Sequence, residues 1–302
     1  MIWPDELPRV VFGCGNFGGL GSSPALRDKG DPREQALALL DHARGLGLTR
    51  FDTANTYGGG VSETVLGEWL RRQDKAFRTR AQIATKVGNP HGCPAGERPL
   101  SGAQVAGHLE RSLRRLGLER IDLYYLHEFD PVTPLDETLQ ALDLALAQGK
   151  IAAFGVSNAR REDLAAVAAQ AGGALRRAFT HVQNEFNLIE QRDLADVIPL
   201  ACSEGIAYVA FSPLSGGLLS GKYRAGEPAD PATRVAVAPE IYRDRLTAFT
   251  FAEIDALRRR AADRGWTVPV AALRFVLDTP GVDSLIIAPR SIEQFEAYGM
   301  GD

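Results

Sequence analysis

The sequence has few cysteines, no long apolar run and no large excess of charge of one sign. Its three cysteines, Cys14, Cys93 and Cys202, show neither zinc-ligand nor redox spacing. This favours a reducing compartment, and we predict a cytoplasmic protein without a metal site. No apolar run reaches the ~20 residues of a membrane span, and no signal-peptide pattern opens the chain. With 34 basic and 38 acidic residues, the net charge is -4, so we expect no binding to nucleic acid or membranes.

Short apolar runs alternate with amphipathic segments along the whole chain. Eight runs predict strands, at 9–15, 50–54, 81–87, 121–127, 151–157, 181–186, 206–212 and 282–288. Helical patterns follow almost every strand, one of them with Ser62 as its N-cap, and a long loop is expected at 213–245. Continuous apolar strands are typical of a parallel sheet covered on both faces. The pattern therefore predicts one α/β domain over residues 1–302, a (β/α)₈ TIM barrel.

Two glycine-rich motifs resemble nucleotide-binding loops but lack the required context. Residues 13–18 read GCGNFG, yet the helix and the acidic residue of a dinucleotide-binding fingerprint do not follow at the right places. Residues 216–223 read GGLLSGKY, where Tyr223 replaces the magnesium-binding Ser or Thr of a P-loop. A doubly wound dehydrogenase and an NTPase are therefore disfavoured, although a glycine loop with a lysine can still hold a pyrophosphate.

Four residues with useful proton chemistry follow three successive strands: Asp52, Tyr57, Lys86 and His127. Taken singly, each has a structural explanation, such as a solvated lysine or a hydrogen-bonded core histidine. A barrel, however, brings the carboxyl ends of its strands to one mouth. Together they would form a proton donor: an ammonium near a phenol lowers the phenol pKa. In this hypothesis Asp52 orients Lys86, and His127 binds the substrate oxygen.

The motifs around these residues resemble those of the aldo-keto reductases over nearly the whole chain. FDTANTYGGGVSETVLGEWL (51–70), IATKVG (83–88) and RSLRRLGLERIDLYYLHEFD (111–130) match the segments that carry the four residues. GKIAAFGVSNA (149–159), VQNEF (182–186), FSPLSGGLLSGKY (211–223) and RSIEQFEA (290–297) resemble the cofactor-binding segments. The resemblance implies a barrel reductase of aldehydes and ketones that uses NADPH, with NADH less expected.

The resemblance also implies a role for each matching residue. Tyr57 would be the general acid, Lys86 and Asp52 would tune it, and His127 would orient the carbonyl; Tyr57, His127 and Phe129 would line the substrate pocket, with Phe17 as a further apolar wall. Matches to cofactor-binding positions are Asn16, Phe17, Asp52, Ser157, Asn158, Gln183, Phe211, Ser212, Leu214, Gly216, Lys222, Arg234, Arg290 and Gln294. Arg290 favours NADPH because a guanidinium binds a 2′-phosphate in a fork.

Several alternatives stay open at this level. Some aldo-keto reductase relatives are cofactor-sensing regulatory subunits with little turnover, and a hydrolase with Asp52 and Glu185 as paired carboxylates is a third hypothesis. The family usually has Pro-Gly and Asn where this chain has Ile287, Ala288 and Tyr298, and it usually continues further beyond Met300. The carbonyl substrate, and whether the protein is a monomer or a homo-oligomer, do not follow from the sequence.

Overall fold

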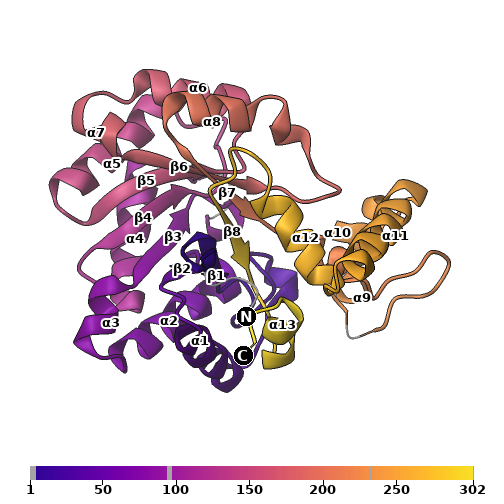
Figure 1. Cartoon of the computed structure of the whole chain (residues 1–302). Helices are drawn as coiled ribbons and strands as arrows, with labels where there is room; N and C mark the ends of the chain where they lie inside the picture. The colour runs from indigo at the N-terminus through magenta and orange to yellow at the C-terminus, as the bar shows by residue number, and fades with distance from the viewer. Residues whose placement is uncertain (1–4, 94–96, 232, 302) are drawn as a thin grey trace.

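Eight parallel strands form a closed barrel in the computed structural model, which describes residues 5–93, 97–231 and 233–301. The strands follow one another around the barrel in sequence order (Figure 1). They are β1 (Val10–Gly13), β2 (Arg50–Asp52), β3 (Gln82–Val87), β4 (Ile121–Leu126), β5 (Ile151–Ser157), β6 (Phe179–Glu185), β7 (Ala207–Phe211) and β8 (Ser284–Ile287). Pairing of Phe12 with Ile287 joins the first strand to the last. The predicted (β/α)₈ barrel is confirmed.

Helices cover the outside of the barrel between successive strands and after the last strand. They are α1 (Arg33–Gly45), α2 (Val61–Arg71), α3 (Lys75–Arg80), α4 (Gly102–Leu116), α5 (Leu135–Ala147), α6 (Arg161–Gln170), α7 (Gly173–Ala178), α8 (Val197–Glu204), α12 (Val268–Leu277) and α13 (Ile292–Ala297). No helix among the described residues has the length and apolar character needed to cross a membrane.

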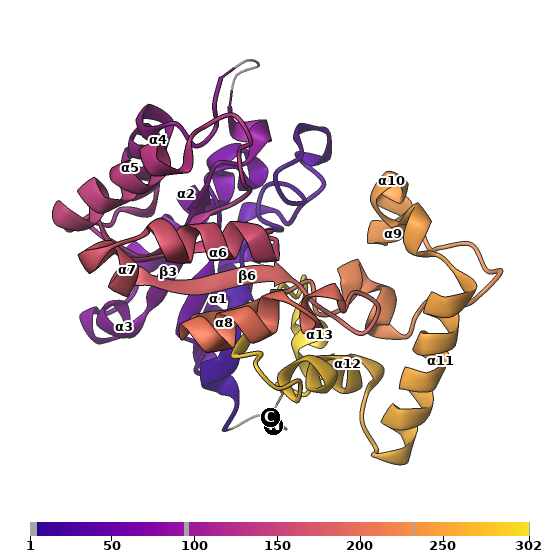
Figure 2. The same cartoon turned by 90° about the horizontal axis from the view of Figure 1, so that it is seen from above.

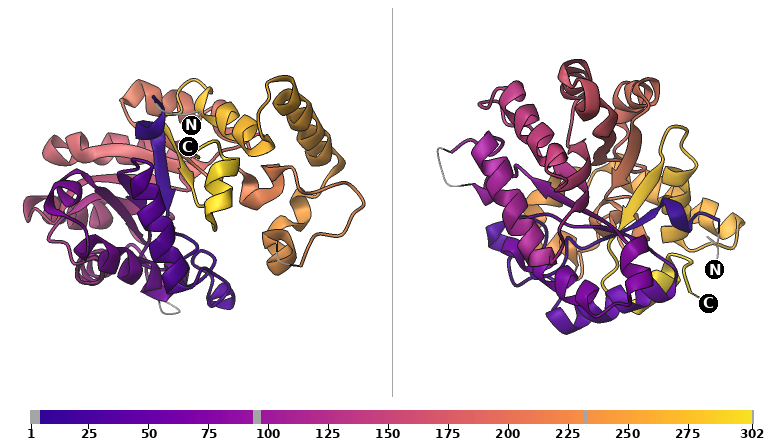
Figure 3. Two further views of the ribbon diagram at one scale, coloured as in Figure 1. Left: turned by 60° about the horizontal axis from the view of Figure 1, so that its bottom comes forward. Right: turned by 90° about the vertical axis from the view of Figure 1, so that its left-hand side faces the viewer.

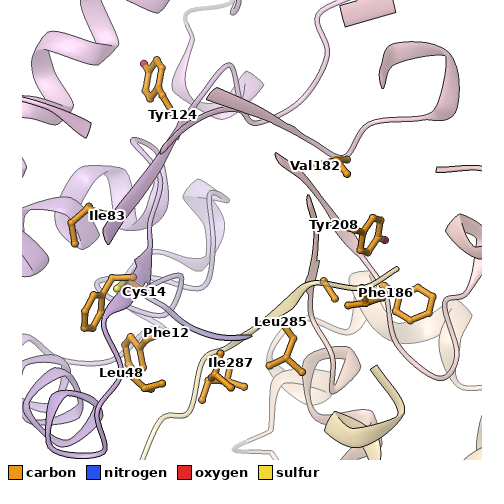
Figure 4. Packing of buried hydrophobic residues seen from close by; sticks show 14 of the residues in the cluster. Phe12, Cys14, Leu48, Ile83, Tyr124, Val182, Phe186, Tyr208, Leu285 and Ile287 are labelled. Atoms are coloured by element: carbon orange, nitrogen blue, oxygen red, sulfur yellow. The ribbon is translucent and has the colours of Figure 1, made fainter. Parts of the chain in front are cut away.

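The largest core lies between the barrel and these helices. Strand residues such as Ile83, Tyr124, Val182 and Tyr208 are buried there, each from a different strand (Figure 4). A smaller apolar cluster comprises Val11, Val209 and Ile286, which come from three neighbouring strands. Because the wall of the barrel is packed tightly, the strand ends that carry polar residues are held at fixed positions.

The segment predicted as a loop at 213–245 contains short helices, so that prediction is wrong in part. It comprises the 3₁₀ turns η6 (Ser215–Ser220) and η7 (Arg243–Arg245) and the helices α9 (Arg234–Val237) and α10 (Pro239–Tyr242). Val235 and Tyr242 pack with Leu20 and Leu26 in a second, separate core cluster. One-turn helices have no periodic pattern to detect, because each presents only one or two apolar side chains.

The helices α9, α10 and α11 (Ala248–Asp263) lie together at one side of the barrel. Figure 2 and the left panel of Figure 3 show this group standing away from α3 to α7. The segment from η6 to α11 leaves the barrel after β7 and returns through α12 to β8. It is therefore an insertion between the last two strands that begins at the carboxyl end of β7.

The helix α2 begins differently from the prediction. Its N-cap is Gly60 with a φ of 98°, a left-handed conformation that suits glycine. Ser62 is buried, and its Oγ donates to the Cys14 carbonyl at 2.8 Å and lies 2.7 Å from Thr53 Oγ1. Ser62 thus ties α2 to the ends of β1 and β2, and its assignment as the N-cap is wrong.

Candidate active site

The structure brings the four predicted proton-transfer residues together at the carboxyl ends of three neighbouring strands. Asp52 ends β2, Lys86 is the penultimate residue of β3, and His127 directly follows β4. Tyr57 opens the short 3₁₀ turn η3 (Tyr57–Gly60), which follows β2. In this turn Gly58 and Gly59 have φ values of 56° and 69°. These left-handed glycines allow a tight turn directly after Tyr57, which keeps Tyr57 at the carboxyl end of the barrel.

Lys86 is the centre of the cluster and is buried, with 1% of its surface exposed. Its Nζ forms a salt bridge with Asp52 Oδ1 and donates to the Thr53 carbonyl at 3.0 Å and to Tyr57 Oη at 3.2 Å. The other Asp52 oxygen accepts from Gln183 Nε2 at 2.9 Å. All three ammonium donors are therefore used. Because Tyr57 Oη accepts from Lys86, its own O–H remains available to donate to a ligand.

The net effect on Tyr57 differs from the sequence-based expectation of a lowered pKa. Burial raises the pKa of the Tyr57 phenol above its ordinary value, and the Lys86 ammonium opposes that rise only in part. Burial alone would lower the pKa of Lys86, but Asp52 and Tyr57 together raise it. At neutral pH the site therefore holds a protonated phenol beside a charged ammonium, the state required of a general acid.

His127 contacts the same phenol from the side. Its ring centroid lies 5.6 Å from that of Tyr57, with an angle of 84° between the planes. Burial and the nearby Lys86 charge lower the pKa of His127 well below its usual value, so the ring is neutral at pH 7. Nδ1 is buried and has no hydrogen-bond partner among the described residues. Independently of that atom, a neutral imidazole has one N–H that can donate to a ligand beside Tyr57.

The next strands around the barrel end in residues that suit an amide and an aromatic ring. Ser157 ends β5, Gln183 lies in β6, and the half-buried Phe211 ends β7. Asn158 has a φ of 53° and donates from its backbone N–H to the Gln183 carbonyl at 3.1 Å. Its side chain also donates to the His127 carbonyl at 3.0 Å. These bonds connect the ends of three strands into one surface.

Beyond β7 the backbone forms a turn with several left-handed residues. Ser212, Ser215, Gly216 and Gly217 have φ values of 51°, 46°, 63° and 101°. Leu214 lies within this turn and is buried. Ser215 to Gly217 are consecutive left-handed residues that turn the backbone sharply, and the N–H groups of Ser215 and Gly217 donate within the turn, to the Ser212 and Leu214 carbonyls at 2.8 and 2.9 Å. A phosphate at this turn would therefore be held mainly by side chains and by nearby cations.

Three cations lie near this turn, at Lys222, Arg234 and Arg290. Partial burial lowers the pKa of Lys222, and the charges of Arg234 and Arg290 lower it further, against the opposing charge of Asp230. Since like charges act on one another only over short distances in a partly solvated site, the three cations share one region. The residues present thus fit a dinucleotide: polar groups and an aromatic ring at the strand ends, then clustered cations beside the left-handed turn.

The remaining predicted cofactor residues have partners within the chain. The buried Asn16 donates from Nδ2 to the Ala288 carbonyl at 3.0 Å, and its Oδ1 accepts from Arg234. Gln294 Oε1 accepts from the Arg290 backbone N–H at 2.9 Å. Phe17 is 1% exposed and packs against Phe12 in the core, so the expectation that its ring forms a pocket wall is wrong. Phe17 follows β1, where a pocket residue would be expected, but the backbone directs its ring into the core.

Sequence reasoning missed two charged pairs at the edge of the site. Asp31 is buried and pairs with Arg290, with 2.7 Å between Oδ1 and Nε. Glu185 accepts from Arg245 Nη1 at 2.5 Å and Nη2 at 2.9 Å. No local sequence pattern predicts either ion pair, because the partners lie 259 and 60 positions apart in the sequence. With Arg245 on Glu185 and Lys86 on Asp52, both carboxylates of the hydrolase hypothesis are neutralised.

Comparison with known proteins yields one family and several relatives. The family model described as "Aldo/keto reductase family" matches residues 9–298. The chain is 33% identical over 300 residues to the uncharacterized oxidoreductase YrpG of Bacillus subtilis, covering 96% of this chain and 85% of that protein. It is 31% identical over 277 residues to the L-glyceraldehyde 3-phosphate reductase of Escherichia coli, covering 87% and 77%. A probable aldo-keto reductase 1 of Glycine max is 31% identical over 223 residues, covering 72% and 59%.

Proposed function

The chain belongs to the aldo/keto reductase family of NAD(P)H-dependent oxidoreductases, and we propose that it reduces an aldehyde or ketone with NADPH, using Tyr57 as the general acid. The observation that carries this proposal is the contact of 3.2 Å between Tyr57 Oη and Lys86 Nζ. The lysine is in turn paired with the buried Asp52. A protonated phenol beside a fixed ammonium is suited to give up its proton to a carbonyl oxygen.

When bound, the reduced nicotinamide supplies a hydride to the carbonyl carbon. Tyr57 donates its Oη proton to the carbonyl oxygen, and the product is an alcohol. The phenolate that remains is stabilised by Lys86, whose charge is maintained by Asp52. The neutral His127 ring hydrogen-bonds the same carbonyl oxygen and holds it near Tyr57. Each residue thus stabilises charge that develops only as the carbonyl is reduced.

We propose that the cofactor lies across the carboxyl ends of β5 to β8. Ser157, Asn158 and Gln183 would hold the carboxamide, and Phe211 would stack on the nicotinamide. The pyrophosphate would bind at the left-handed turn, against Ser212, Leu214, Gly216 and Lys222, with Arg234 nearby. The 2′-phosphate would bind Arg290, and Gln294 would support the adenosine end. Asn16, the Phe17 backbone and Asp52 would complete the walls.

The substrate in this proposal is a small carbonyl compound held by Tyr57, His127 and Phe129. Phe129 is half-buried and lies two residues beyond His127. The Escherichia coli relative is named for reduction of L-glyceraldehyde 3-phosphate, which supports testing short hydroxylated aldehydes first. Free thiols at all three cysteines support a reducing, cytoplasmic location.

Two measurements on the purified protein test the function. Fluorescence titration with NADPH and NADH is expected to show binding of both, with NADPH tighter. A panel of aldehydes and ketones, followed by oxidation of NADPH, is expected to reveal turnover of at least one small aldehyde. Tighter binding of NADH would contradict the role of Arg290. Tight NADPH binding without turnover across the panel, together with a stable protein partner, would instead favour a cofactor-sensing subunit.

A further inference from the structure

Arg290 is already paired with a carboxylate inside the protein. Asp31 is 2% exposed, and its Oδ1 accepts from Arg290 Nε at 2.7 Å. The second oxygen, Oδ2, is also buried and has no hydrogen-bond partner among the described residues. Burial raises the pKa of Asp31, against the opposing charges of Arg290 and Arg234. A buried carboxylate with an unsatisfied oxygen is costly for stability alone, so a role in ligand selection is the better explanation.

The ion pair with Asp31 fixes the orientation of the Arg290 guanidinium but does not use all of its N–H groups. Arg290 Nη2 donates to the Lys29 carbonyl at 3.4 Å. The Arg290 backbone N–H donates to Gln294 Oε1 at 2.9 Å, and its carbonyl accepts from Gln35 Nε2 at 2.5 Å. Within the described parts of the chain, no partner is found for Nη1. A phosphate can therefore reach only one side of the fork, since the Nε side is occupied by Asp31.

The carboxylate also changes the charge that a phosphate meets. A 2′-phosphate bound to the outer side of Arg290 would lie a few ångströms beyond Asp31, and like charges at such distances repel strongly in a partly buried site. NADH lacks this phosphate and is indifferent to the carboxylate. We propose, on the basis of the proposed function, that Asp31 helps to determine the specificity for NADPH or NADH. It weakens the hold of Arg290 on the 2′-phosphate and so limits the preference for NADPH over NADH.

Asp31 can be altered without loss of its backbone contacts. Its N–H donates to the Asn16 carbonyl at 2.6 Å, and its carbonyl accepts from Gly18 at 3.3 Å. Asp31→Asn keeps both bonds and keeps an oxygen for Arg290 Nε, while it removes the negative charge. Asp28→Asn is the matched control, because it removes the charge of an exposed carboxylate three residues earlier in the same loop.

The experiment measures dissociation constants by titration calorimetry for NADPH, NADH, adenosine 2′,5′-bisphosphate and adenosine 5′-phosphate. In Asp31→Asn we expect the preference for the 2′-phosphorylated member of each pair to rise by about tenfold, as for loss of a nearby like charge. Binding of NADH and of adenosine 5′-phosphate is expected to stay within about twofold of the wild type. Asp28→Asn is expected to leave the preference unchanged.

An unchanged or reduced preference in Asp31→Asn would overturn the inference, because a purely structural role weakens both members of a pair alike. In an Arg290→Gln background the same substitution is expected to have no effect on the preference, which shows that the charge acts on the phosphate held by the guanidinium. If Asp31→Asn does not fold, Asp31→Ser removes the charge with a smaller side chain. Failure of the wild type to bind either dinucleotide would refute the proposed function itself, whereas binding of both with no response to Asp31 refutes only this inference.

Discussion

The Lys86 ammonium lies 3.2 Å from the phenol oxygen of Tyr57 and donates to it. The direction of this bond decides the chemistry, because a phenol that accepts from lysine has its own hydrogen free for a substrate. The same ammonium is anchored by Asp52 and by the Thr53 carbonyl. The lysine thus connects a buried charge in the barrel wall to a proton donor at the mouth.

Replacement of the ammonium is expected to abolish most of the reduction. In Lys86→Met nothing stabilises the phenolate that forms on Tyr57, and we expect kcat to fall by about 10²–10⁴-fold. Wild-type kcat/KM is expected to stay level from about pH 6 to pH 9, since burial raises the pKa of Tyr57 and keeps the phenol protonated. Stopped-flow rates across this range check both points. Lys150→Met, which removes a surface lysine paired with Glu110, is the control and should leave kcat unaltered.

Asp52 is expected to matter for stability as well as for catalysis. Asp52→Asn leaves the Lys86 charge buried without its counter-ion, and we expect the free energy of unfolding to fall by about 3–5 kcal/mol. The double variant Asp52→Asn/Lys86→Met removes both charges and should be more stable than Asp52→Asn alone. Urea denaturation of the four proteins of this cycle measures the coupling. If Asp52→Asn and the double variant are equally stable, the ion pair between Asp52 and Lys86 is solvated and not buried.

Arg245 is expected to hold the segment from η6 to η7 against the barrel. It contacts Glu185 through two bonds and donates to Ser215 Oγ at 3.0 Å. Arg245→Gln breaks the fork, and we expect faster dissociation of NADPH and a loss of about 1–3 kcal/mol in the free energy of unfolding. The exposed Arg243, in the same turn, supplies the control Arg243→Gln. If both variants release NADPH at the wild-type rate, the segment does not contribute to cofactor retention.

The histidine His181 is expected to make stability depend on pH. Burial first, and then the charge of Arg50, lowers its pKa to about 4, against about 6.5 in an unfolded chain. Between these values the unfolded chain binds more protons, so stability falls as the pH is lowered from about 6.5 to 4. In His181→Gln the contribution of His181 to this slope is lost and the slope becomes shallower, while the contribution of the buried His127 remains. The exposed His91→Gln keeps the full slope. Thermal unfolding at several pH values between these limits distinguishes the two variants.

The barrel could be predicted from the sequence because each strand and most helices carry their own pattern. Eight apolar runs, each followed by a helical period, leave few other topologies, and strand ends predict where polar residues gather. The four residues of the proton-transfer cluster followed from this placement together with the family motifs. Local pattern was sufficient there because Asp52, Lys86 and His127 each lie at or next to the carboxyl end of a strand, on three successive strands.

The parts that could not be predicted depend on contacts between distant segments. Asp31 meets Arg290 only because β1 pairs with β8 and brings both following loops together. Phe17 turns into the core although its motif suggests a pocket wall, since its neighbour is Phe12. The net pKa shift of Tyr57 depends on burial, which a sequence does not display. Such features arise from tertiary packing and from desolvation, and neither leaves a periodic signal.

The central claim is that Tyr57 donates the proton, and Tyr57→Phe tests it most directly. This variant keeps the aromatic ring next to His127 and removes only the hydroxyl. With a carbonyl substrate found in the panel and saturating NADPH, we predict that kcat falls by about 10²–10⁴-fold. The dissociation constant of NADPH should stay within about twofold of the wild-type value. A Tyr57→Phe protein that reduces the same carbonyl at the wild-type rate would contradict the account.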